Sequence, residues 1–281
     1  MKIIISRKGF DNANGKCASP ILPDGDMVSM PIPTEESSGL KFEEIFYQGR
    51  TYAQMWEELS EKAYHLYPSG FCHLDPDIRE DVRSEKIPGW KPAFGQTGAA
   101  QGYLQGQNVD VGDIFLFFGT FHQTEEKDGK LSYCRGRRGK SVDFYVKSDL
   151  HIIYGYLQVG EIITDPGRIK REYPWHPHSR FSDKNNVLYI PADKLTINGE
   201  DQGVKGYGIL NYDKKRVLTK EGYSKGNWIK RAFYMPENVA GNRKNSSKSE
   251  DALYYAGIWQ EIVLKDTTEE LIDWVKELIL S

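Results

Sequence analysis

The sequence predicts an α+β fold: a single domain, spanning residues 1–281, in which helices flank a mixed or antiparallel, barrel-like sheet. Two segments, residues 114–118 and 149–163, have strand length and are dense in β-branched and aromatic side chains. Gly112 marks the turn before the first segment, and Gly155 interrupts the second. Isolated glycines within a strand indicate bulges or close backbone approach, the features with which small barrels turn their corners.

Composition is that of an ordinary globular chain, with 39% hydrophobic and 27% charged residues. The formal net charge of −3 gives no overall basic field of the kind that marks a nucleic-acid binder. The 3 cysteines are widely spaced without a C-x-x-C pair, which favours a reducing, cytoplasmic location. No apolar run approaches the roughly 18 residues of a membrane span, so we expect no contact with a membrane.

At the amino terminus, residues 2–6 predict a short buried strand that runs into a glycine- and asparagine-rich loop. Arg7 and Lys8 follow at the carboxyl end of this strand, near Asp11. One interpretation is a phosphate grip, with Arg7 as a bidentate fork and Lys8 as a point charge. A solvated turn with a local ion pair is the alternative. Residues 23–25 (Pro-Asp-Gly) predict a hairpin turn.

The next predicted element is a helix that starts at Thr51. Thr51 and Gln54 have the spacing of a capping box. Apolar residues then recur at helical spacing and predict one packed face, made of Tyr52, Met55, Trp56, Leu59 and Ala63.

The segment FCHLDPDIRED places His73, Asp75 and Asp77 at alternate positions. Pro76 disfavours a helical conformation for Asp75, and in an extended chain the three side chains would share one face. Such a face could pair a general base with its orienting acid or hold a divalent ion. The alternative is a helix N-cap at Asp75 with proline at the first helical position.

Two glutamines, Gln96 and Gln101, flank the small-residue stretch from 97 to 100, where a backbone could approach a ligand closely. The segment matches neither a phosphate-binding loop nor a dinucleotide fingerprint. Tight helix packing is the more ordinary use of its alanines.

Between the two main strands, residues 125–149 interleave basic and aromatic side chains. This composition suits a phosphate backbone with stacked bases, although the acidic residues among them favour a solvated hairpin tip. The basic residues are Lys127, Lys130, Arg135, Arg137, Arg138, Lys140 and Lys147.

His176 and His178 lie two apart across a proline, so in an extended chain they point to one side. They could bind a ligand or a metal, although histidines in surface loops are common. Further on, residues 185–195 and 258–264 predict strands. A last helix should be capped by Thr267 with Glu270 and pack through Leu271, Trp274, Val275, Leu278 and Ile279.

The Gly-Asp entry, the apolar strand and the glycine-interrupted strand ending in Gly-Glu resemble the pseudouridine-synthase-and-archaeosine-transglycosylase (PUA)-like barrels. Many of those barrels bind nucleic acids or modified bases. The resemblance implies a barrel-like core and a nucleotide or nucleic acid as partner.

A second resemblance covers more of the chain, from residue 3 to about 235. The sequence resembles the nucleotide modification associated domain 3 family, named for its company with nucleotide- and DNA-modification systems in bacteria and phages. This implies partner proteins of a modification or defence system, but no particular reaction. The resemblance rests on SRKGFD, SPILPDG, PIP, HLDPD, W-x-x-x-FGQ-x-GAAQ, VGDIFLFFG, IIYGYLQVGEI, HPH and LYI.

Two functions stay open on this basis. The first is an enzyme acting on a nucleotide or base, whose catalytic candidates are His73, Asp75, Asp77 and Asp11. Its nucleotide-binding candidates are Arg7, Lys8, Gln96, Gln101, His176 and His178. The second is a non-catalytic PUA-like reader of modified nucleic acid, or a partner subunit that binds a nucleotide signal, with the base stacked on Trp90, Tyr156 or Trp175.

The sequence predicts no cofactor, and a metal site is the weakest of its hypotheses. His73, Asp75, His176 and His178 could share an ion only if the fold brings together positions about a hundred residues apart.

Overall fold

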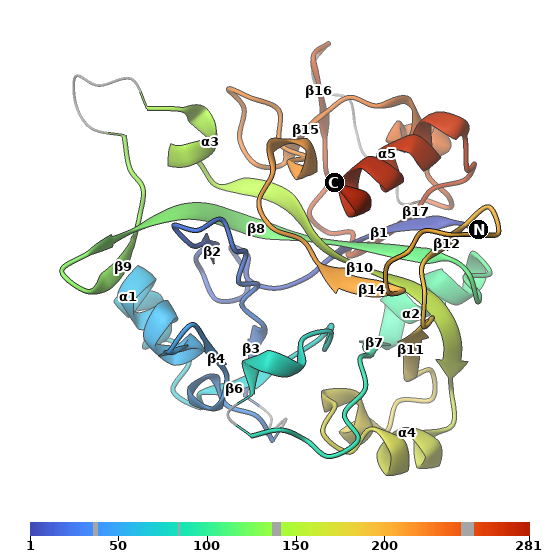
Figure 1. The fold of residues 1–281 in the computed structure, drawn as a ribbon, viewed down its shortest axis with the longest axis horizontal. Coiled ribbons are helices and arrows are strands. Elements are labelled where there is room, and N and C mark those ends of the chain that lie inside the picture. The colour runs from blue at the N-terminus through green and yellow to red at the C-terminus, as the bar shows by residue number, and fades with distance from the viewer. Residues whose placement is uncertain (36–38, 84, 137–141, 243–249) are drawn as a thin grey trace.

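The computed structural model describes residues 1–35, 39–83, 85–136, 142–242 and 250–281. Within them the chain forms the predicted α+β fold, with helices flanking a mixed sheet (Figure 1). The α-helices are α1 (Tyr52–Tyr64), α2 (Gly98–Gly106), α3 (Phe144–Lys147), α4 (Pro166–Glu172) and α5 (Glu269–Leu280). None of the described helices is long and apolar enough to cross a bilayer.

The strands, in chain order, are β1 (Ile3–Arg7), β2 (Ser19–Ile21), β3 (Ile32–Thr34), β4 (Phe46–Tyr47), β5 (Arg50–Thr51), β6 (Phe71–His73), β7 (Phe94–Gln96), β8 (Ile114–Lys127), β9 (Lys130–Tyr133), β10 (Leu150–Ile163), β11 (Val187–Pro191), β12 (Thr196–Ile197), β13 (Glu200–Asp201), β14 (Tyr207–Ile209), β15 (Asn227–Ile229), β16 (Ala252–Tyr254) and β17 (Glu261–Val263). Short 3₁₀ turns complete the set: η1 (Phe42–Glu44), η2 (Glu80–Val82), η3 (Pro177–Arg180), η4 (Lys214–Arg216), η5 (Ala232–Tyr234) and η6 (Pro236–Asn238).

The main sheet is a curled half-barrel. Its strands follow the order β17-β1-β8-β10-β11-β7, with β2 and β9 also paired to β8 and β14 to β10. Strands β1 and β2 run parallel to β8, and the other pairs are antiparallel. The end strands β7 and β17 do not pair with each other, so the described residues form no closed barrel. The predicted barrel-like core is therefore an open one.

Strands β8 and β10 form the axis of this sheet and cross the molecule side by side (Figure 1). The register of β10 shifts between Ile153 and Gly155 against β8, and between Val159 and Glu161 against β11. The first shift falls at Gly155, the glycine that predicted a bulge, and the second falls at Gly160 of the same strand. Strand β8 is longer than the predicted segment because it continues through a hairpin into β9, whose turn residue Asp128 has a positive φ of 51°.

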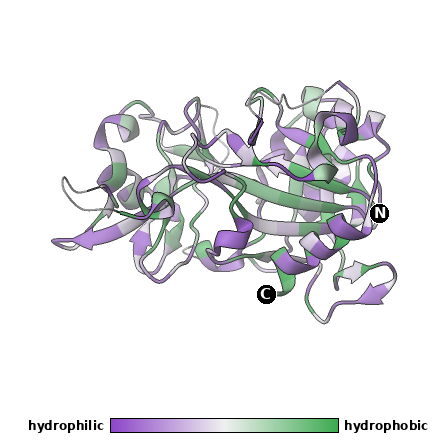
Figure 2. Cartoon of the chain, turned by 90° about the horizontal axis from the view of Figure 1, so that it is seen from above, coloured by the Kyte–Doolittle hydropathy of each residue, from purple (hydrophilic) through white to green (hydrophobic). Residues whose placement is uncertain are grey.

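Both faces of β8 are covered, which explains its unbroken apolar run. On one face Phe115 and Phe117 pack against Phe94, with ring centroids 4.9 and 5.2 Å apart. On the other face Phe118 contacts Trp228 and Tyr255 from the carboxyl-terminal third of the chain. The hydrophobic segments accordingly run through the centre of the molecule, and the hydrophilic ones lie mostly at its periphery (Figure 2).

Helix α1 starts at the predicted cap. Thr51 Oγ1 accepts a hydrogen bond from Gln54 N at 3.0 Å, and Gln54 Oε1 accepts one from Thr51 N at 2.8 Å. Its buried face, with Trp56 at the centre, packs on Phe10 and Phe42 in a second hydrophobic cluster. Because Phe10 lies in the loop that follows Arg7, the last residue of β1, this cluster fixes that loop.

Helix α2 bridges the open side of the sheet. Tyr103 Oη donates a hydrogen bond to Ala240 O at 2.9 Å and accepts one from Val263 N of β17 at 3.1 Å. On the same helix, Gln101 Oε1 accepts a hydrogen bond from Tyr189 Oη of β11 at 2.9 Å. The small residues at 98–100 thus begin a helix, but Gly98 and Ala99 are exposed, so the predicted packing through the alanines is wrong and α2 packs through Gln101, Tyr103 and Leu104 instead.

Two expectations about helix starts were wrong. No helix begins at Asp75; the nearby turn η2 starts after Arg79, because Asp77 pairs through its backbone with Ala93. Helix α5 is capped by Thr268, whose Oγ1 accepts from Leu271 N, whereas Thr267 binds the carbonyl of Met1. The face of α5 from Leu271 to Ile279 is buried as predicted. Of the basic residues in 125–149, Arg137, Arg138 and Lys140 lie outside the described residues.

A buried histidine makes the fold sensitive to acid. His151 Nδ1 accepts a hydrogen bond from Trp228 Nε1 at 3.0 Å, and burial lowers the pKa of His151 from 6.5 to about 3. The unfolded chain therefore binds this proton more readily, and the stability present above pH 6.5 falls as the pH falls towards 3. The expected slope of the free energy of unfolding for this one group is about 1.4 kcal/mol per pH unit.

Urea unfolding of His151→Gln and of the unaltered chain at pH 7 and pH 5 tests this assignment. On acidification the free energy of unfolding should fall less in the variant, by about 1.4 kcal/mol for each pH unit below 6.5. An unchanged pH slope in the variant would contradict this assignment.

Candidate functional site

Most of the predicted polar residues meet in one cavity of about 440 Å³, here called the histidine pocket. It lies where six separate segments come together: the end of β1 with the loop after it, β3, the end of β6, the end of β7, the turn η3 and the residue before β17. The predicted residues that line it are Arg7, Lys8, Asp11, His73, Asp75, Gln96 and His178.

The backbone of β7 positions the acidic group of the pocket. Gly95 N donates a hydrogen bond to Asp75 Oδ1 at 2.7 Å. Strand β6 pairs with β3, so that His73 lies opposite Ile32, and the extended chain then carries Asp75 to β7. His73 and Asp75 thus share one site, as the extended interpretation of HLDPD predicted.

Gly95 also makes room for a histidine. A Cβ atom at this position would lie 2.2 Å from Cδ2 of His178, closer than two carbon atoms can approach. Only glycine allows the imidazole to lie against the strand. The FGQ segment therefore has glycine at position 95 because the His178 ring occupies the space that a side chain would need.

Three imidazoles surround Asp75. Its Oδ2 lies 3.9 Å from His73 Nε2 and 3.8 Å from His178 Nε2, and its Oδ1 lies 3.4 Å from His176 Nε2. One ligand atom each from His73, Asp75 and His178 lies within 4.8 Å of the others, a group that could hold a metal ion. The fold therefore does bring together positions a hundred residues apart, as the metal hypothesis required.

Burial sets the protonation of this cluster. It lowers the pKa of His73 to about 4 and that of His178 to about 3, so both rings are neutral at pH 7. Burial acts to raise the pKa of Asp75, but the contact with His176 and the nearby charges outweigh it and hold that pKa below its ordinary value. The site thus joins a carboxylate to neutral imidazoles that can accept protons or bind a cation.

Two cations line the pocket, each paired with a carboxylate. Arg7 Nη1 lies 3.0 Å from Asp11 Oδ2, and both side chains are partly exposed. Lys8 is buried: its Nζ lies 3.0 Å from Glu261 Oε1 and 4.1 Å from the centre of the Phe94 ring. Arg7 is thus the accessible cation, whereas Lys8 is engaged beneath the pocket.

The carboxylate of Glu261, on β17, binds side chains from β1 and β7 under the site. It is fully buried, and its Oε1 accepts hydrogen bonds from Ser6 Oγ at 3.1 Å and Gln96 Nε2 at 2.7 Å, in addition to the contact with Lys8. From the sequence, Glu261 is predicted only as part of a strand. One signal of its role is that it is a charged residue directly before the apolar residues of the same strand.

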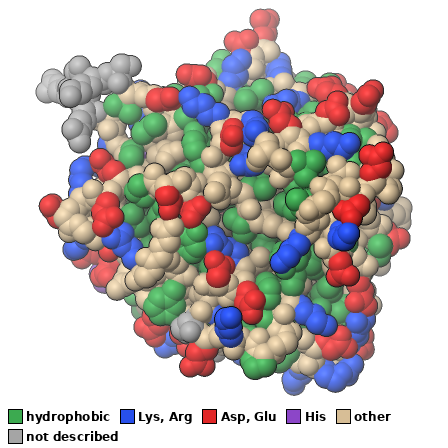
Figure 3. Space-filling view, viewed as in Figure 1, with side chains coloured by type: hydrophobic (Ala, Val, Ile, Leu, Met, Phe, Trp, Pro, Cys, Tyr) green, Lys and Arg blue, Asp and Glu red, His purple; other side chains and the backbone are tan. Residues whose placement is uncertain are grey.

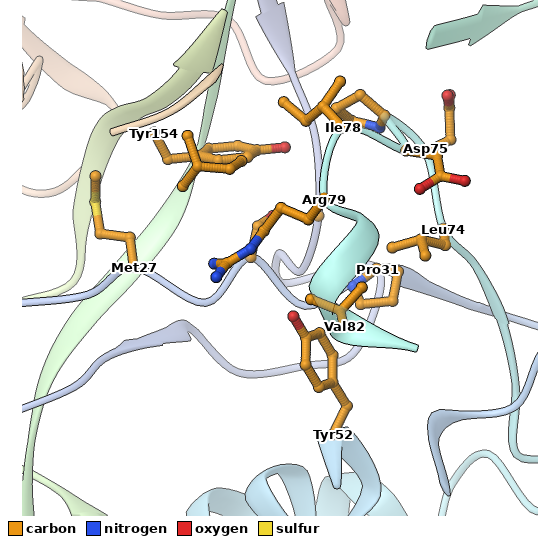
Figure 4. Close-up of a pocket in the computed structure, with 14 residues that line it drawn as sticks. Met27, Pro31, Tyr52, Leu74, Asp75, Ile78, Arg79, Val82 and Tyr154 are labelled. Atoms are coloured by element: carbon orange, nitrogen blue, oxygen red, sulfur yellow. The ribbon is translucent and has the colours of Figure 1, made fainter. Parts of the chain in front are cut away.

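Two predicted residues lie elsewhere. Asp77 is buried against Arg83 and accepts a hydrogen bond from Trp90 Nε1 at 3.2 Å. It lines a second, small cavity that shares Gly9 and Asp75 with the histidine pocket and into which Arg79 points (Figure 4). The alternation with His73 fails because Asp77 enters a backbone bridge with Ala93. The other residue, Gln101, is buried on α2, away from the pocket.

The aromatic side of the pocket also differs from the expectation. Phe181 stacks on His73, with ring centroids 5.5 Å apart and an interplanar angle of 12°. The predicted rings Trp90, Tyr156 and Trp175 are not among the residues that line this pocket. Phe181 was missed because nothing in the sequence links it to His73.

Comparison with known proteins adds a family to this geometry. The model of the family described as nucleotide modification associated domain 3 matches residues 2–265. The chain belongs to this family. A search of curated proteins and a search of solved structures each find no match. The family match includes all the segments that line the histidine pocket, and Glu261.

The role of Gly95 in this family member can be tested with a matched pair of substitutions. Gly95→Ala should displace His178 and reduce stability by about 1–3 kcal/mol, because the added methyl group overlaps the ring. Gly102→Ala, on α2 with no atom within 4 Å of the added carbon, should be neutral or stabilising. Urea unfolding measures both. Equal effects of the two substitutions would contradict the packing role of Gly95.

The contacts of Glu261 predict that its substitution lowers stability more than the same substitution at an exposed glutamate. Glu261→Gln leaves the buried Lys8 ammonium without its counter-charge and should destabilise the fold by about 3–5 kcal/mol. The same substitution at Glu43, which forms an exposed pair with Lys41, should have little effect. Thermal unfolding of the two variants side by side checks this, and a Glu261→Gln variant as stable as Glu43→Gln would refute it.

Proposed function

We propose that the histidine pocket binds a nucleotide or a modified base as part of a nucleotide-modification system. The observation that carries this proposal is the gathering of an accessible arginine, an oriented amide, an aromatic ring and a carboxylate–imidazole cluster in one cavity of about 440 Å³. This volume falls within the range of small-ligand sites. The family supports the class of ligand.

Arg7 is the group that would hold a phosphate. Its ion pair with Asp11 uses Nη1, and a guanidinium has five N–H donors in all. A phosphate arriving at the pocket mouth can therefore be bound by the remaining donors. Asp11 would then orient Arg7, a supporting role in place of the catalytic one considered for it.

Phe181 and Gln96 would recognise the base. Phe181 offers a ring for stacking, and base–aromatic stacking contributes about 1–3 kcal/mol. The amide of Gln96 is fixed by Glu261 and by Thr97 N, whose bond to Gln96 Oε1 is 3.1 Å long. A fixed amide with a spare donor and a spare lone pair is suited to reading a base edge.

With no ion bound in the pocket, acid–base chemistry would fall to His73 and Asp75. The His73 ring is neutral at pH 7 and, because burial lowers its pKa to about 4, it is a weak base that would take a proton only transiently, with Asp75 beside it stabilising the resulting imidazolium. His178 and His176 complete the cluster. Catalysis is the further step of this proposal, and binding alone would satisfy its first part.

A single nucleotide or an extruded base suits this site better than a long polynucleotide. On the face shown in Figure 3, lysine and arginine side chains are intermixed with aspartate and glutamate, without a continuous basic track. A backbone-following reader needs such a track. The pocket instead offers one accessible arginine.

Calorimetric titration with mononucleotides, cyclic nucleotides, modified nucleosides and short DNA and RNA tests the proposal. Arg7→Gln should weaken binding of a phosphorylated ligand by about 10–100-fold, the effect of losing a charged hydrogen bond. Arg50→Gln is the matched control, since Arg50 is similarly exposed and paired with Glu58 and Glu126.

Binding that is confined to polymeric DNA or RNA and lost with salt would favour the non-catalytic reader instead. Absence of any nucleotide binding, or equal affinity in the Arg7 and Arg50 variants, would contradict the proposed site.

A further inference from the structure

We propose that His73, Asp75 and His178 bind one divalent first-row transition-metal ion, Zn²⁺ or Fe²⁺ in type, with open coordination positions facing the histidine pocket. This deepens the proposed function and rests on it only for the identity of the ligand that the ion would meet. The ion site itself stands on the geometry of the three side chains.

The donor atoms are already at separations that an ion can span. Asp75 Oδ2 lies 3.8 Å from His178 Nε2 and 3.9 Å from His73 Nε2, and the three atoms lie within 4.8 Å of one another. Donors bound at about 2.0–2.2 Å to one tetrahedral ion are about 3.3–3.6 Å apart. The two separations from Asp75 Oδ2 therefore need to shorten by a few tenths of an ångström, and the two histidine nitrogens need to approach each other by up to about 1.5 Å, which small side-chain rotations supply.

The neighbours of His178 fix the tautomer that a metal ligand needs. His178 Nδ1 lies 2.6 Å from Asn186 Oδ1, and Asn186 Nδ2 donates to the carbonyl of His178 at 2.8 Å. The second bond orients the amide so that its oxygen faces the ring, which places the imidazole proton on Nδ1. The lone pair of Nε2 then points towards Asp75, as in metal-bound histidines held by an outer partner.

His176 holds the carboxylate rather than the ion. Its Nδ1 accepts a hydrogen bond from His178 N at 3.2 Å, so in the neutral ring the proton is on Nε2, 3.4 Å from Asp75 Oδ1. That Nε2 is fully buried and makes no hydrogen bond of ordinary geometry. Together with Gly95 N it occupies the Oδ1 side of the carboxylate, which leaves Oδ2 for the metal.

The charge around the pocket favours a cation here. The carboxylates of Asp11, Asp75 and Glu261 outnumber the cations of Arg7 and Lys8 by one. A bound divalent ion would reverse this balance and make the pocket attractive to a phosphate or to a carbonyl oxygen of a base. Without the ion, the net negative charge of these five groups opposes the binding of a phosphate by Arg7.

The donor set indicates which metals fit. Two imidazoles with one carboxylate and open positions are typical of zinc and non-haem iron sites, whereas Mg²⁺ and Ca²⁺ prefer oxygen ligands alone. The open positions would face the cavity that Arg7, Gln96 and Phe181 line. An ion placed there acts as a Lewis acid on a bound oxygen.

The test is titration of the chelator-treated full chain with Zn²⁺, and with Co²⁺ followed by visible absorption. We expect one ion per chain. Asp75→Asn, which preserves shape, and His73→Gln should each weaken Zn²⁺ binding by more than about a hundredfold, beyond the 10–100-fold typical of outer partners. His65→Gln, at an exposed histidine of α1's end, is the matched control and should bind like the unaltered chain.

Asn186 supplies a readout that a merely structural role would not give. Asn186→Ala should weaken Zn²⁺ binding by about 10–100-fold, and Asn186→Asp, which keeps the acceptor for His178 Nδ1, should restore it. Circular dichroism of each variant separates loss of the ion from loss of the fold.

A folded, unaltered chain that binds neither Zn²⁺ nor Co²⁺ would overturn the proposal, as would unchanged affinity in the folded Asp75 and His73 variants. Nucleotide titration of the metal-free chain separates the two proposals. Nucleotide binding without any metal binding would leave the proposed function standing and remove the ion, and stoichiometric metal binding without nucleotide binding would do the reverse.

Discussion

A buried carboxylate closes the open side of the sheet. Strands β7 and β17 end the half-barrel and form no ladder with each other, yet Gln96 of β7 and Glu261 of β17 are joined by a side-chain hydrogen bond of 2.7 Å. Ser6 and Lys8, from β1 and its end, bind the same carboxylate oxygen. A buried charge is tolerated only when it is paired and hydrogen-bonded, so these partners must keep their places together. The floor of the histidine pocket is fixed by that requirement.

The pocket above this floor depends on close backbone approach. On strand β7, Gly95 N donates a hydrogen bond to Asp75. Because Gly95 has no side chain, the His178 ring lies directly against the strand. The next residue of the strand, Gln96, reaches down to Glu261. Two consecutive residues of one short strand thus connect the imidazole cluster to the buried ion pair. The polar groups of the site are held by the scaffold rather than by one another alone, which is the arrangement that keeps a binding site preorganised.

The sequence predicted the local parts of this site and missed the parts that depend on distant contacts. Spacing alone placed His73 and Asp75 together, and glycines predicted the irregular register of β10. Asp77 was misplaced because alternation holds only while the chain stays extended, and the backbone pairing with Ala93 redirects it. The contacts of Glu261 with Lys8 and of Phe181 with His73 were missed, since these partners lie more than a hundred residues away in the chain. Pairing of β1 with β8 and β17, which unites these segments, has no short-range signature.

The meeting of β1 and β17 has a consequence for synthesis on the ribosome. Lys8 and its partner Glu261 are 253 positions apart, so Lys8 is synthesised long before Glu261. A nascent chain that stops before β17 has a lysine committed to an apolar wall beside Phe94 without its counter-ion. The central sheet can assemble earlier, because β8 and β10 are near neighbours in the sequence, but the site cannot. Completion of the pocket therefore requires translation through β17, and fragments that stop before β17 would lack the binding site even where their core has formed.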